Sequence, residues 1–179
     1  MTSVIGRTLT ATAIALALAS AAPASHAQET DALVSVQTDW SVFNPPEEPK
    51  ECWGVSKPKE TVNTRDGKPV SVRRGDILLF VTFRPGNGAK GEVSFTGGYP
   101  FAPGSTVNAT IDGSSFDLFI DGEWAWPATK TDDDAILVAL KKGTTAVLTA
   151  RSAKGTNTKD TFSLRGFTAA MQDAEKRCG

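Results

Sequence analysis

Two cysteines constrain this fold more than any other feature: Cys52 near the start of the main body of the chain and Cys178 next to its end. The chain opens with an export signal, and export to an oxidising compartment favours a disulfide between the two. The alternative is a pair of free thiols for redox or metal chemistry, but CxxC spacing and added histidine ligands are lacking. A Cys52–Cys178 bridge would tie the last helix to the first strands.

Residues 1–27 are typical of a secretory signal peptide. Arg7 ends a short first region, Leu9–Leu18 is an apolar run, and Ser25-His26-Ala27 offers the small-x-small cleavage pattern. This apolar run is too short to span a membrane, and no later run reaches spanning length. We therefore expect cleavage near Ala27, no transmembrane segment in the mature chain, and location in the periplasm or secretion. Residues 28–38 predict a flexible leader, with an edge strand as the alternative.

The single histidine of the sequence, His26, lies within this signal. A mature chain without imidazole has no Ser-His-Asp or Cys-His nucleophilic site and no histidine-based metal site. Asp132–Asp134 lacks the spacing of a calcium-binding loop. Ser56-Lys57-Pro58-Lys59 matches S-x-x-K, but Pro58 disfavours the helix start that this motif needs. We predict a non-enzymatic protein without cofactor or metal.

The charge balance excludes the partners that need a basic footprint. The formal net charge is −1 at pH 7, and loss of Arg7 with the signal makes the mature chain more acidic. We therefore expect no nucleic-acid binding. Nine Phe and four Trp in a chain of this length indicate a globular core, and residues 39–179 predict one domain.

Short apolar segments separated by turn residues predict a mainly β protein, with an antiparallel β-sandwich or barrel-like domain and two short α-helices. Ile77–Phe83 is the most apolar run and predicts a central strand buried on both sides. Asp66-Gly67 predicts a hairpin. The first helix is predicted after Thr131, with acids in its first turn and Gly143 after its end. The second ends the chain.

The C-terminal helix has an apolar face. Phe167, Met171, Ala174 and Cys178 follow one another at helical spacing. This face must be buried if Cys178 is to reach its partner.

A three-stranded meander over residues 106–126 carries the candidate binding residues. Its turns, Asp112-Gly113 and Asp121-Gly122, suit two-residue type I′ hairpins. This register pairs Ile120 with Glu123 and puts Phe119 opposite Trp124. Phe119, Trp124 and Trp126 then share one face, while the opposite face belongs to the core. These three aromatics form a candidate partner-binding surface, unless the first helix, which follows directly, covers them.

Several segments together resemble the invasion-associated locus B family of exported alphaproteobacterial proteins. They are W-S-V at 40–42, C-W-G-V-S-K-P at 52–58, R-R-G-D-I-L-L-F-V-T-F-R-P at 73–85, G-E-V-S-F-T-G-G-Y-P-F at 91–101, D-G-E-W-A-W-P at 121–127 and T-K-D-T-F-S-L at 158–164. The resemblance covers residues 40–178. It implies a link to host-cell entry, but carries over no catalytic or ligand residues.

The sequence thus predicts an exported, non-enzymatic binding protein whose partner is an envelope or host-surface protein or glycan. One alternative is a periplasmic accessory or assembly factor that docks on another envelope protein through the aromatic residues. A second is a carboxylate-based glycan hydrolase, since 20 acidic residues offer many pairs and no spacing singles one out. A cleft with two carboxylates, one of raised pKa, would favour the hydrolase.

Overall fold

The computed structural model describes residues 32–178, so the predicted signal peptide over 1–27 lies outside the described residues. Twelve strands, two α-helices and one short 3₁₀ helix make up the described chain. Their bounds are β1 (Leu33–Gln37), β2 (Trp40–Phe43), β3 (Cys52–Ser56), β4 (Glu60–Arg65), β5 (Lys68–Pro69), β6 (Leu78–Arg84), η1 (Pro85–Asn87), β7 (Ala89–Thr96), β8 (Val107–Ile111), β9 (Ser114–Asp121), β10 (Trp124–Trp126), α2 (Lys130–Lys142), β11 (Thr145–Arg151), β12 (Asn157–Ser163) and α3 (Phe167–Cys178).

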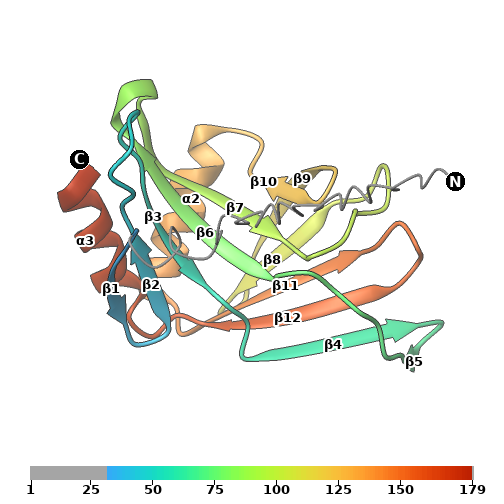
Figure 1. The fold of residues 1–179 in the computed structure, drawn as a ribbon. Coiled ribbons are helices and arrows are strands. Elements are labelled where there is room, and N and C mark those ends of the chain that lie inside the picture. The colour runs from blue at the N-terminus through green and yellow to red at the C-terminus, as the bar shows by residue number, and fades with distance from the viewer. Residues whose placement is uncertain (1–31, 179) are drawn as a thin grey trace, which may run out of the picture.

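The strands form one antiparallel sheet in the order β1-β2-β3-β6-β7-β10-β9-β8-β11-β12-β4-β5. This sheet curls back on itself, so that β6 and β7 lie across from β11 and β12 (Figure 1). Phe95 of β7 and Phe162 of β12 are far apart in the strand order, yet their ring centroids are 6.2 Å apart. The prediction of a mainly β, antiparallel domain with two helices, the second C-terminal, is confirmed.

The core fills the inside of this curl. Leu79 and Val81 of β6 are buried while Leu78 and Phe80 are half-buried, as expected when one face of this part of the strand is buried. The prediction that this run is buried on both sides is therefore wrong for Phe80, which lies on the outer face and is half-buried. Helix α2 contributes Ile136 and Leu140, both buried, to the inside of the curl.

Helix α3 closes the end of the sheet formed by β1, β2 and β3 (Figure 1). All four residues of its predicted apolar face are buried. Gly54 of β3 faces this helix, and a Cβ there would collide with the Met171 side chain. The Trp40 and Phe167 rings meet edge to face, with centroids 4.8 Å apart.

The expected disulfide is present. Cys52 of β3 and Cys178 of α3 are bonded, with their Cα atoms 5.8 Å apart, although they are 126 positions apart in sequence. Cys52 is fully buried. The bridge therefore fixes the last turn of α3 onto the sheet, and it is a bond that oxidising compartments maintain.

Two local expectations need correction. The leader predicted over 28–38 is, in its described part, the edge strand β1, which pairs with β2. The first helix is capped by Thr129, whose side chain accepts a hydrogen bond from the Asp132 amide, and not by Thr131. Gly143 ends that helix with φ −81°, outside the left-handed region. Its lack of a side chain serves packing, because a Cβ would meet Ile111 and Leu164.

The first prediction concerns the disulfide. Replacing Cys52 and Cys178 together by alanine should lower the free energy of unfolding by about 2–5 kcal/mol, because the unfolded chain regains the entropy of a long closed loop. Denaturant unfolding of the oxidised protein and of the double variant measures this difference. Reducing the wild-type protein should reproduce the loss, and equal stability of the two forms would contradict the prediction.

The second prediction concerns Asp112, which occupies the β8–β9 turn at φ 42°. Its carboxylate accepts hydrogen bonds from the amides of Thr144 (2.8 Å) and Thr145 (3.1 Å), and these bonds, with that of the Thr144 hydroxyl, lower its pKa below the usual 3.8. A lowered pKa stabilises the fold above pH 3.8, and this stabilisation is lost as the pH falls through the lowered value.

Asp112→Asn keeps a residue that tolerates positive φ but removes the charge. Thermal unfolding should therefore show a lower midpoint than wild type at pH 7, and a smaller difference once both proteins are below the lowered pKa. An equal difference at both pH values would show that the charge is not responsible.

Candidate functional site

Phe119, Trp124 and Trp126 lie together on the outer surface of β9 and β10. Trp126 pairs with Phe119 across the two strands, and their ring centroids are 5.8 Å apart. The Trp124 and Trp126 rings are near parallel, with centroids 6.3 Å apart. The three aromatic residues therefore share one face of the sheet, as predicted.

The predicted register of this hairpin is wrong in detail. Trp124 pairs with Asp121, and not with Phe119, because Gly122 and Glu123 form the turn. Asp121 remains in the strand, and of the two turn residues only Gly122 has a positive φ. Each residue of β10 therefore pairs two positions further along β9 than predicted. Because side chains alternate between the two faces of a strand, a shift of two positions leaves every side chain on its predicted face. In the first hairpin, Ile111 pairs with Ser114 as predicted.

Helix α2 does not cover these aromatics. It packs on the inside of the curl, where Ile136 and Leu140 face Leu118 of β9. On the outer side Phe119 is 47% exposed and Trp124 is 39% exposed. The alternative of a cover by the first helix is therefore wrong.

Two further aromatic residues extend the surface across the sheet. The Phe80 ring centroid lies 5.7 Å from that of Trp124, and Trp53 of β3 lines the same open groove, whose volume is about 380 Å³. We call Trp53, Phe80, Phe119, Trp124 and Trp126 the aromatic face. Sequence reasoning missed Phe80 because its strand was expected to be buried on both sides. The alternation in Cys52-Trp53-Gly54-Val55, with Cys52 facing the core, was a signal for Trp53.

The groove also holds a small charged cluster. Arg84 forms ion pairs with Glu51 at 2.7 Å and with Glu92 at 3.1 Å. Among the described residues, burial raises the pKa of two carboxyl groups, Asp133 and Asp160, and neither lines the groove. The combination that would favour a glycan hydrolase is therefore not found in this groove.

A second concave site, the basic pocket, lies among loops beside the β9–β10 turn, which supplies Glu123. Its volume is about 460 Å³. The charged side chains that line it are Arg65, Arg73, Arg74, Glu123 and Lys154. Its uncharged lining residues are Val72, Gly98, Tyr99, Pro100, Ser152, Ala153, Thr156 and Thr158.

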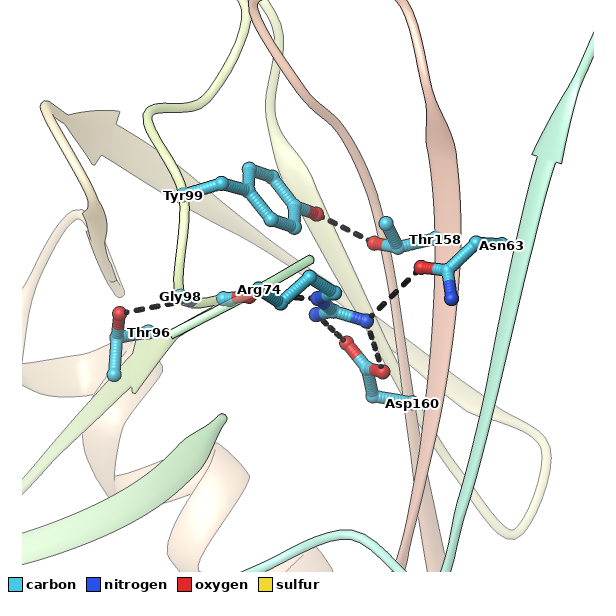
Figure 2. A network of polar contacts seen from close by, with 8 residues as sticks. Asn63, Arg74, Thr96, Gly98, Tyr99, Thr158 and Asp160 are labelled. Carbon is cyan, nitrogen blue, oxygen red and sulfur yellow. Dashed lines mark hydrogen bonds and ion pairs between the residues drawn. The ribbon is translucent and has the colours of Figure 1, made fainter. Parts of the chain in front are cut away.

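A buried ion pair supports this pocket. Figure 2 shows the Arg74 guanidinium between the Tyr99 ring and Asp160. Its two terminal nitrogens donate to the two carboxylate oxygens of Asp160 at 2.8 and 2.6 Å, and the side chains are 6% and 0% exposed. Burial raises the pKa of Asp160, although the hydrogen bonds from Arg74 oppose this. The guanidinium carbon lies 5.0 Å from the centroid of the Tyr99 ring.

Residues 32–178 contain no cluster of three or more His, Cys, Asp or Glu side chains arranged to hold a metal. In the same range, no helix combines the length and the apolar character needed to cross a membrane.

Comparison with known proteins bears on the family. Residues 125–175 match the family model described as Invasion associated locus B (IalB) protein. No curated protein sequence matches the chain. A solved structure, the invasion associated protein B of Bartonella henselae, has a TM-score of 0.53 and 18% sequence identity, covering 78% of this chain and 94% of that one. At this identity the structural comparison shows a shared fold. Residues 125–175 are thus similar to the invasion-associated locus B family, and the chain shares the fold of a protein that is named for invasion.

Proposed function

We propose that this chain is an exported, non-enzymatic binding protein that holds an envelope or host-surface component on its aromatic face. The observation that carries the proposal is the exposure of clustered rings on the outer side of the sheet, while the core is complete on the inner side. Large exposed aromatic clusters are uncommon on proteins without partners. The signal-peptide pattern and the disulfide support a periplasmic or secreted location.

The geometry of this face suits a partner that offers flat apolar groups. Each aromatic side chain has only two rotatable bonds, so little side-chain entropy is lost when a partner covers the rings. Thr82, Ser94 and the Arg84 cluster add hydrogen-bonding groups to the same groove. Sugar rings and the side chains of a docking protein both fit this mixture. The solved relative is named for invasion, which is consistent with a host-surface partner.

Binding should depend on the two tryptophans. Isothermal titration calorimetry with soluble peptidoglycan fragments and host-type oligosaccharides tests a glycan partner, and pull-down from envelope fractions tests a protein partner. Trp124→Ala/Trp126→Ala should abolish the binding found with wild type, because truncating central aromatic contacts removes much of an interface's energy. Val138→Ala, an exposed position on α2, is the matched control and should bind normally. Equal binding by the double variant would refute the proposal.

A surface role also predicts a pattern of stability. Trp124→Ala should lower the free energy of unfolding by less than about 1.5 kcal/mol, because the side chain is only partly buried. Trp40→Ala should cost about 3–5 kcal/mol, because Trp40 is 0% exposed and its indole N–H donates to the Ser163 carbonyl. Denaturant unfolding of both variants gives the comparison. Losses of equal size would mean that Trp124 is a core residue.

A further inference from the structure

The basic pocket carries an excess of positive charge on a chain whose formal net charge is −1. Asp160 neutralises Arg74 beneath it. Arg65, Arg73 and Lys154 then face a single acid, Glu123. None of these four side chains is in an ion pair within residues 32–178. A concave site with unmatched cations attracts anions and concentrates them.

The walls of the pocket are fixed before any ligand binds. Gly75 donates a backbone hydrogen bond to Gly98 at 2.8 Å, which joins the β5–β6 and β7–β8 loops. Ala153 donates to the Pro100 carbonyl at 2.9 Å, which joins the β11–β12 turn to the β7–β8 loop. Gly98 has φ +71° and lies so close to Gly75 that a Cβ would collide with its backbone. Small-molecule sites are usually preformed in this way.

The rest of the lining indicates the kind of ligand. Tyr99, Pro100 and Val72 provide apolar surface, while Arg74 beside Tyr99 is held rigidly by Asp160 (Figure 2). Arg65 is also oriented, because it donates to the Thr156 hydroxyl at 2.8 Å. Guanidinium groups bind carboxylates and phosphates through paired hydrogen bonds.

We infer that the basic pocket binds a small organic anion, with a carboxylate or phosphate group held by Arg65, Arg73 and Lys154 and its body against Tyr99 and Pro100. This site is separate from the aromatic face, so its ligand is not the partner proposed above. The volume of about 460 Å³ is within the range of small-molecule sites.

The sequence offers a direct reporter, because Tyr99 is its only tyrosine. Protein labelled with ¹³C-tyrosine gives the ring signals of Tyr99 alone, which can be followed during titration at constant ionic strength. The probes are glucose 6-phosphate, glucuronate and, as the neutral match, glucose. Saturable shifts with either anion and none with glucose are expected. A response to one anion alone assigns the head group as phosphate or carboxylate; absence of a response to both, or an equal response to glucose, overturns the inference.

Charge variants distinguish specific binding in the pocket from nonspecific attraction of anions to surface cations. Arg73→Gln/Lys154→Gln should weaken anion binding by about tenfold or more, because both side chains line the pocket. Lys141→Gln/Lys142→Gln removes the same charge at the end of α2 and should leave the affinity unchanged. Equal weakening by both pairs would overturn the inference. Trp124→Ala should not change anion binding, so failure at the aromatic face and failure at this pocket are distinguishable.

Discussion

The structure depends on the alternation of side chains along strands that belong to a single curled sheet. Each strand can send only one face into the space that the curl encloses. Trp40, Val81, Phe95 and Phe162 fill that space, together with the apolar faces of the two helices. Large rings at the alternate positions are therefore left outside. The aromatic face follows directly from this constraint, because no second layer covers β9 and β10 among the described residues.

The same alternation explains what could be predicted from sequence. The prediction that the three aromatic residues share one face was correct although the predicted register was wrong, because the register error was an even number of residues. The buried face of α3 followed from spacing, since Phe167, Met171, Ala174 and Cys178 repeat with the helical period. The disulfide followed from the export signal and from the presence of two cysteines. The error itself arose because Asp121-Gly122 and Gly122-Glu123 are both acceptable two-residue turns. Tertiary pairing with β7, where Trp124 lies opposite Thr96, selects between them, and no local signal reports it.

The basic pocket was beyond such reasoning. Arg74 and Asp160 are 86 positions apart and come from a loop and a strand that no periodicity connects. Removing either partner alone would leave a buried, uncompensated charge, which is strongly destabilising. The pair thus determines where the β5–β6 loop lies against β12. Asp160 also neutralises the charge of Arg74, so the positive potential of the pocket comes from Arg65, Arg73 and Lys154.

The two sites share one structural element. Glu123 lines the basic pocket, while the next residue, Trp124, belongs to the aromatic face. The β9–β10 turn, which contains Glu123 and directly precedes Trp124, is attached to the β7–β8 loop by a hydrogen bond from the Phe101 amide to the Gly122 carbonyl at 2.9 Å. A ligand that moved this turn would change the position of the Trp124 ring relative to Phe80. The turn is held by this hydrogen bond to the pocket wall, and β10, which follows it, pairs with β7. The fold therefore favours fixed positions for both sites.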